Sequence, residues 1–110
     1  MIQHIVLFKL KEEIQGEAKA ALIREIEHRF EALPDEIKEL RSLSIRPNRN
    51  PAEEYDFALL AKLETKKDLH AYAEHPRHKA LGAELLKPNV EKRACVDVWN
   101  ELEITGNKKR

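Results

Sequence analysis

The spacing of apolar residues is the feature that most constrains the fold, because it switches along the chain between the period of a strand and the period of a helix. Residues 2–10 are apolar on both faces of a strand, whereas residues 17–33 place apolar side chains every three or four positions. Residues 41–47 and 55–63 alternate on either side of a loop rich in turn residues. The first half of the chain therefore predicts a strand, a helix and a two-stranded hairpin.

The second half predicts an interrupted helical region and a last strand. Thr65 is a suitable N-cap for a helical region that extends to residue 88. We expect this helix to break at His75 and to resume at Pro76. A residue before proline disfavours the helical conformation, and proline is tolerated at the first helical position. Residues 93–104 then alternate again, which favours a final strand.

The resulting order, β-α-β-β-α-β, predicts an α+β protein of the ferredoxin-like class, with both helices on one face of an antiparallel sheet. We expect a single domain over residues 1–104 and a basic tail over residues 105–110. An apolar sheet face without a cover needs a partner, so we expect a homodimer that associates through its sheet faces. The residues predicted to lie on that face, away from the helices, are Ile5, Leu7, Cys95 and Trp99.

Composition argues against several classes of function. Twenty basic and twenty acidic residues cancel, so no net charge attracts nucleic acid or an anionic membrane, and three glycines make no phosphate-binding loop. The apolar opening segment lacks the basic region of a signal peptide and is shorter than the ~20 residues of a spanning helix. We therefore expect a cytoplasmic protein without nucleic-acid or membrane partners. Its one cysteine, Cys95, is expected to be buried.

The segment YAEHPRHKAL, residues 72–81, gathers Tyr72, His75 and His78 around a proline. Two histidines three residues apart can suggest a metal site, but zinc needs three or four ligands, and Pro76 disturbs the helical geometry that would align the pair. His4 could complete such a site only by a coincidence of packing. We therefore predict that the protein uses no metal and no cofactor.

With its element order, the strand HIVLFKLK and the segment YAEHPRH, the chain resembles the stress-responsive dimeric α/β barrel (Dabb) family over nearly its whole length. The resemblance implies a homodimer with a cleft in each subunit between helices and sheet. The family includes stress-induced proteins and a plant polyketide cyclase. The working tyrosine and histidine of that cyclase match Tyr72 and His78, and its strand histidine matches His4. The chain departs from the cyclase at Phe57 and Glu27, where the cyclase has a histidine and a tyrosine.

These residues lead to a functional hypothesis. The dimer would bind a small, apolar, oxygen-bearing molecule in the cleft. If the protein is an enzyme, it would use cofactor-independent acid-base chemistry of the cyclase or lyase type, with His78 as base and Tyr72 as hydrogen-bond donor. Two alternatives stay open: a non-catalytic, stress-associated structural dimer and, by fold analogy, a cofactor-free monooxygenase-like enzyme. The residues predicted to contact the bound molecule are His4, Val6, Phe8, Phe30, Phe57 and His75.

Overall fold

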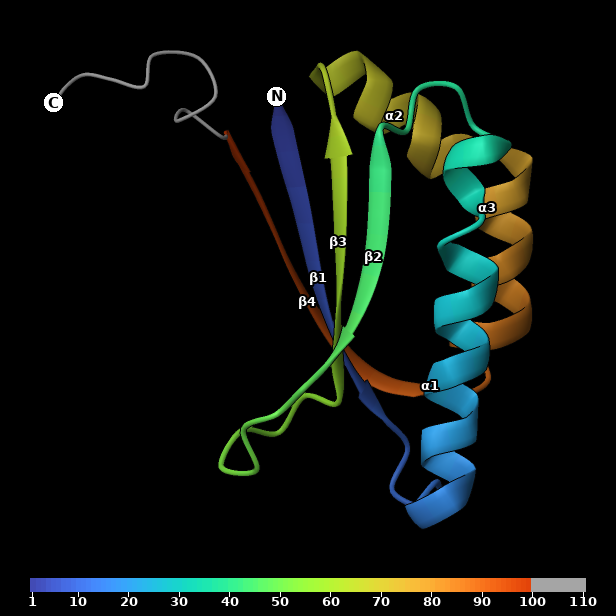
Figure 1. Cartoon of the computed structure of the whole chain (residues 1–110), viewed down its shortest axis with the longest axis vertical. Helices are drawn as coiled ribbons and strands as arrows, with labels where there is room; N and C mark the ends of the chain where they lie inside the picture. Colours follow the sequence, from blue (N-terminus) through green and yellow to red (C-terminus); the bar gives the residue numbers. More distant parts are fainter. Residues whose placement is uncertain (100–110) are drawn as a thin grey trace, which may run out of the picture.

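A computed structural model describes residues 1–99 of the 110-residue chain. One face of a four-stranded antiparallel sheet is covered by the helices (Figure 1). The strands follow the order β2-β3-β1-β4 across the sheet, and their bounds are β1 (Ile2–Leu10), β2 (Ser42–Pro47), β3 (Phe57–Leu63) and β4 (Val90–Trp99). The helices are α1 (Gly16–Phe30), α2 (Lys66–Glu74) and α3 (Pro76–Leu81), with a 3-10 turn, η1 (Leu33–Asp35), and a π-helical turn, η2 (Gly82–Leu86). The predicted ferredoxin-like α+β fold is confirmed.

Element boundaries differ slightly from those expected. Helix α1 ends at Phe30, and the chain then turns through η1 before it reaches β2. Strand β3 begins at Phe57 rather than at residue 55. The predicted strand residues 100–104 and the predicted tail lie outside the described residues. Within residues 1–99, no helix is both long enough and apolar enough to cross a membrane.

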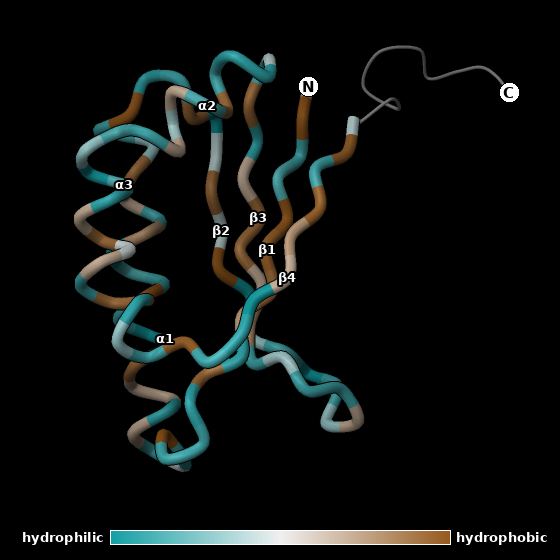
Figure 2. The backbone as a smooth tube through the Cα atoms, turned by 180° about the vertical axis from the view of Figure 1, so that it is seen from behind, coloured by the Kyte–Doolittle hydropathy of each residue, from teal (hydrophilic) through white to brown (hydrophobic). Residues whose placement is uncertain are grey.

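The core lies between the sheet and the helices. Burial alternates strictly along β3, as expected for a strand with one covered face. Helix α1 places Ile23, Ile26 and Phe30 on its buried side, and both views show the helical layer on one side of the sheet (Figures 1 and 2). The side chains of Arg29 and Glu84 join α1 to η2 through two hydrogen bonds of 3.2 and 2.9 Å.

The expected break in the second helical region is confirmed. His75 has φ −65° and ψ 135°, an extended conformation between α2 and α3. The Thr65 hydroxyl oxygen accepts a hydrogen bond from the Asp68 backbone N–H at 3.1 Å, which caps α2. At the break, His75 Nδ1 accepts a hydrogen bond from the Arg77 backbone N–H at 3.1 Å, and Pro76 occupies the first turn of α3. The break is therefore encoded locally, by a proline and two caps.

The register of β4 corrects the predicted face of Cys95 and Trp99. Strand β4 pairs with β1 so that Trp99 lies opposite Ile2 and Cys95 lies opposite Val6. Directly paired residues share a face of the sheet, and Ile2 and Val6 face the helices. Cys95 and Trp99 therefore also lie on the helix side, contrary to the prediction. The prediction that Cys95 is buried is wrong as well, because this edge strand is left uncovered and Cys95 is exposed.

The outer face of the sheet is still apolar, but it is formed by other residues of β4. Ile5 pairs with Val96 and Leu60, and Leu7 pairs with Ala94 and Ala58. No residue of this group is buried, and Val96 and Val98 keep 51% and 42% of their surface exposed. We call this surface the outer sheet face. Its apolar residues are Ile5, Leu7, Ala58, Leu60, Ala94, Val96 and Val98.

Candidate functional site

A cleft of about 580 Å³ opens between the helices and the sheet. Strands β1, β3 and β4 form one wall, and α2, α3 and η2 form the other. The cleft exists because α2 and α3 stop short of β4, so that the helix side of this edge strand has no helix over it. Its lining is mainly apolar with a few polar groups, which is typical of a small-molecule site: His4, Val6, Phe8, Leu59, Tyr72, Ala73, His78, Gly82, Leu86, Lys87, Val90 and Arg93.

Tyr72, from α2, is the central polar group of the cleft wall. It is 1% exposed, and its hydroxyl forms no hydrogen bond within the part of the chain that the structure describes. Burial raises the pKa of the Tyr72 phenol, so the hydroxyl keeps its proton and remains a donor at neutral pH. A buried hydroxyl without a partner costs about 1–3 kcal/mol. A bound molecule that offers an acceptor oxygen would recover this energy.

His78, from α3, lies against the Tyr72 ring, with ring centroids 4.5 Å apart. Its Nδ1 is 3.2 Å from the Ala73 carbonyl oxygen. Because a carbonyl can only accept, Nδ1 carries the proton and Nε2 keeps its lone pair. Burial lowers the pKa of His78, and the hydrogen bond to Ala73 opposes part of this shift. His78 is therefore neutral near pH 7 and has the protonation state of a general base.

His4 completes the polar group from the opposite wall. Its ring lies edge-on to the Tyr72 ring with centroids 6.2 Å apart. Its Nδ1 is 2.5 Å from Asp97 Oδ1 and 3.7 Å from Cys95 Sγ. Strand pairing explains these contacts, since His4 lies directly opposite Asp97, and Cys95 is two residues away on the same face.

A second hollow, of about 430 Å³, adjoins the cleft and shares His4 and Ala73 with it. Its other lining residues include Asp97 and Trp99 of β4 and His70 of α2. The two hollows together follow the exposed helix side of β4 along much of its length.

Two cations lie along the cleft. Lys87 and Arg93 both contribute to its lining, and both are exposed. Neither forms an ion pair with another residue in the described range 1–99. In contrast, the nearby Lys92 is paired with Glu54 at 2.8 Å. The cleft therefore offers positive charge that no described side chain neutralises.

Five of the predicted site residues meet at the cleft: Tyr72, His78, His4, Val6 and Phe8. The other three lie elsewhere. Phe30 and Phe57 are buried in the core and do not line the cleft, although Phe57 stacks on Phe8 with ring centroids 5.1 Å apart. His75 caps α3 through its side chain and is likewise absent from the lining.

Sequence reasoning missed Asp97, Lys87 and Arg93. Asp97 could have been placed beside His4 from the alternation of β4, but only if the strand register had been known. Lys87 and Arg93 belong to the turn and strand that follow α3, and no local pattern distinguishes them from other surface cations.

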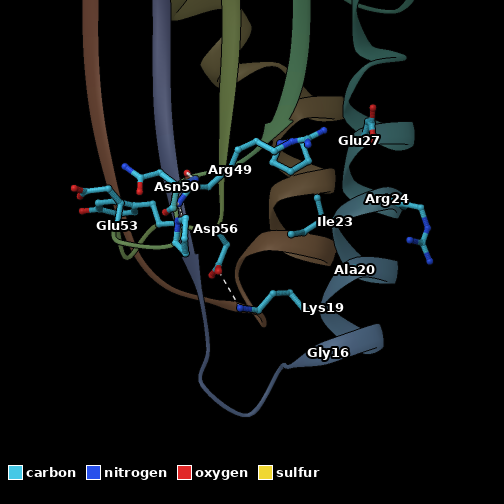
Figure 3. A pocket seen from close by; sticks show the side chains of 14 residues that line it. Gly16, Lys19, Ala20, Ile23, Arg24, Glu27, Arg49, Asn50, Glu53 and Asp56 are labelled. Atoms are coloured by element: carbon cyan, nitrogen blue, oxygen red, sulfur yellow. Dashed lines mark hydrogen bonds and ion pairs between the residues drawn. The ribbon is translucent and has the colours of Figure 1, made fainter.

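A larger hollow, of about 650 Å³, lies between α1 and the loop that joins β2 to β3 (Figure 3). Asp56, one of the charged residues that line it, is already paired. Asp56 accepts hydrogen bonds from Lys19 Nζ at 2.9 Å and from the Leu10 backbone N–H at 2.7 Å. Figure 3 shows the Lys19–Asp56 contact bridging the hollow, while Arg24 points away from it. We interpret Asp56 as a structural tether between β1, α1 and the loop.

A ferredoxin-like sheet with a helix–sheet cleft and an apolar outer face defines the class of dimeric α/β barrel proteins. The chain belongs to the Stress Responsive A/B Barrel Domain (Dabb) family, whose model matches residues 2–100. This confirms the resemblance found in the sequence. No curated protein sequence matches the chain.

Solved structures agree with this assignment. The chain is 37% identical to a dimeric protein of unknown function with a ferredoxin-like fold from Bacteroides fragilis NCTC 9343. The match has a TM-score of 0.81 and covers 88% of this chain and 93% of that one. A dimeric ferredoxin-like protein of unknown function from Thermobifida fusca YX is 28% identical, with a TM-score of 0.73 and 88% of each chain covered.

A hydroxynitrile lyase from Passiflora edulis shares the fold at 17% identity. Its TM-score is 0.72, and the match covers 88% of this chain and 90% of the lyase. At this identity the likeness extends to the fold alone.

Proposed function

We propose that the protein is a homodimer that binds a small, apolar, oxygen-bearing molecule in the helix–sheet cleft and acts on it by cofactor-independent acid-base chemistry. The unpartnered Tyr72 hydroxyl beside His78 is the observation that carries this proposal. A protein that used the cleft only for packing would gain stability from a partner for this hydroxyl or from phenylalanine in its place.

The two residues have complementary roles in the proposed reaction. Nε2 of His78 removes a proton from a carbon activated by neighbouring carbonyl groups. Tyr72 donates a hydrogen bond to the carbonyl oxygen on which negative charge develops. Such donors are most effective in a site that excludes water, because the stabilisation is stronger where the dielectric constant is low. The resulting enolate is the common intermediate of aldol-type ring closure and of the reverse, lyase-type cleavage.

The positive charge along the cleft favours a ligand that carries a negatively charged group. Lys87 and Arg93 lack ion-pair partners among the described residues, and they lie in a lining that is otherwise mainly apolar. A carboxylate on the ligand would pair with them, and Arg93 could bind it in a bidentate manner. We therefore propose a keto acid with an apolar chain as the preferred ligand class.

The proposed dimer associates through the outer sheet face. A contiguous apolar surface that stays exposed in a monomer is typical of an interaction site. A two-fold axis lets the same surface cover itself in a second copy. The dimeric relatives from Bacteroides fragilis and Thermobifida fusca support this arrangement.

Deuterium exchange tests the base chemistry directly. Benzoylacetone, a β-diketone probe, carries an acidic carbon between two carbonyls, and NMR follows the exchange of its hydrogens in D₂O. We expect the wild-type protein to accelerate exchange, His78→Gln to abolish the acceleration, and Tyr72→Phe to reduce it by about 10²-fold or more. The matched control is His28→Gln, because His28 is an exposed histidine of α1 outside the cleft lining. Acceleration over the protein-free rate that persists in His78→Gln would refute the assigned base.

Light scattering tests the dimer. We expect about twice the chain mass of 12.8 kDa for the wild type, and a monomer for Val96→Glu, which places a charge in the outer sheet face. Glu91→Gln, an exposed change at the start of the same strand, should remain dimeric. A wild-type protein that is monomeric at micromolar concentration contradicts the proposal.

A further inference from the structure

Three potential metal ligands meet on the helix side of the sheet, where β1 and β4 pair. His4, Cys95 and Asp97 each offer one ligand atom, and these atoms all lie within 4.8 Å of one another. The cluster stands at the junction of the cleft and the adjoining hollow, both of which His4 lines. We propose that these three residues bind one zinc-type divalent metal ion.

The backbone fixes the positions of all three residues. His4 and Asp97 are paired directly across the antiparallel ladder, and Cys95 precedes Asp97 by two residues and so shares its face. Because both strands belong to the hydrogen-bonded sheet, the spacing of the ligands is already fixed, and no loop has to become ordered when the metal binds. The site is therefore largely formed before a metal arrives, and little conformational entropy opposes binding.

Distances between the ligand atoms suit tetrahedral coordination after a small adjustment. Zinc binds sulfur at about 2.3 Å and imidazole nitrogen at about 2.0–2.1 Å, which implies a sulfur–nitrogen separation of about 3.5 Å. His4 Nδ1 and Cys95 Sγ are 3.7 Å apart. His4 Nδ1 and Asp97 Oδ1 are 2.5 Å apart, so the carboxylate must withdraw slightly. The side chain of Asp97 is 44% exposed and has room to do so.

The chemistry of the donors selects the class of metal. A thiolate favours zinc and other borderline or soft ions, and one thiolate with an imidazole and a carboxylate excludes the all-oxygen environment that magnesium and calcium require. Three protein ligands leave the fourth position of a tetrahedral zinc ion open to water. When the metal binds Nδ1 of His4, the ring proton lies on Nε2, and Cys95 binds as a thiolate after its thiol proton is released to solvent.

The sequence predicted no metal because only the pair His75 and His78 was weighed, with His4 as a third ligand by coincidence. In the structure, Nδ1 of His75 and Nδ1 of His78 each form a hydrogen bond with a backbone group. The proposed ligands come instead from two strands, β1 and β4, and His4 and Cys95 are 91 residues apart in the sequence. This inference does not depend on the proposed chemistry of Tyr72 and His78, although His4 belongs to both sites.

Cobalt titration tests the site with a direct signature. Protein prepared without a histidine tag is stripped with a chelator and titrated with Co²⁺ in the absence of any organic ligand. Because Cys95 is the only cysteine of the chain, a thiolate-to-cobalt charge-transfer band can arise only from this residue. We expect one equivalent of Co²⁺ per chain with this band, and displacement of Co²⁺ by Zn²⁺.

Variants of two of the three ligands distinguish binding at the proposed site from nonspecific binding. Cys95→Ser should remove the band. Asp97→Asn should weaken Co²⁺ binding by more than about 10-fold, since even outer-shell changes cost roughly 10–100-fold. His28→Ala and Tyr72→Phe should bind as the wild type does, which distinguishes this site from the acid-base pair. Circular dichroism establishes that each variant is folded. Absence of the band in the wild type, or unchanged affinity in Asp97→Asn, would overturn the proposal.

Discussion

The two edge strands of the sheet differ in what covers their helix-facing side chains. On β2, Leu43 and Ile45 are buried beneath α1 and η1, and the Ile45 backbone N–H at the open edge donates to the Glu31 carboxylate at 2.8 Å. On β4, every helix-facing side chain from residue 93 onward is exposed to solvent: Arg93, Cys95, Asp97 and Trp99. The helix-facing side of β2 is therefore part of the hydrophobic core, whereas that of β4 is exposed from residue 93 onward.

The difference follows from the helices. Helix α1 is continuous over fifteen residues and lies along β2. The second helical region is divided at His75, and its parts, α2 and α3, have only nine and six residues. Neither part covers the helix side of the ten-residue strand β4 from residue 93 onward, where the side chains stay exposed. The cleft lies at this limit of the helical layer, and both proposed sites are next to it.

Substitution of one leucine beside each edge strand should show the largest difference in the free energy of unfolding between the two edges. Leu33 is fully buried in η1 beside β2, whereas Leu86 is half-buried in the cleft wall. We expect Leu33→Ala to lower the free energy of unfolding by about 2–5 kcal/mol, because it opens a cavity in a closed core. Leu86→Ala should cost about 1 kcal/mol, because solvent already reaches its surroundings. Urea denaturation measures both, and equal losses would contradict the distinction between the two edges.

This contrast also explains which parts of the molecule the sequence could predict. The helical break and the Thr65 cap depend on neighbours in the chain, and both were predicted. The face of Cys95 depends on which residue of β1 it meets, so a shift of one residue in the pairing reverses it. The meeting of His4 with Asp97 has the same origin. Phe30 and Phe57 were assigned to the cleft because apolar periodicity marks a buried side chain but does not tell core from cleft wall.

Removal of the Tyr72 hydroxyl should separate stability from function. In Tyr72→Phe the ring is kept and an unpartnered buried hydroxyl is lost. We expect the free energy of unfolding to rise by about 1 kcal/mol, while acceleration of exchange in the β-diketone falls. Urea denaturation and NMR exchange of the same samples measure the two effects. If stability falls instead, the hydroxyl has a partner in the folded protein, and the main support for the cleft as a binding site is removed.

The pH dependence of stability compares His78, which is partly buried in the cleft, with an exposed histidine elsewhere in the chain. Because burial lowers the pKa of His78 in the folded state, the unfolded chain binds more protons below about pH 6.5. The stability that neutral His78 contributes is fully present above this pH and is lost as the pH falls toward the lower, folded-state pKa. We expect wild-type stability to decrease more steeply than that of His78→Gln over this interval, as measured by urea denaturation at a series of pH values.

His28→Gln, at an exposed position, should keep the wild-type slope. Parallel curves for the wild type and His78→Gln would show that His78 is solvated like a surface histidine, which would also remove the reason to expect a neutral base in the cleft.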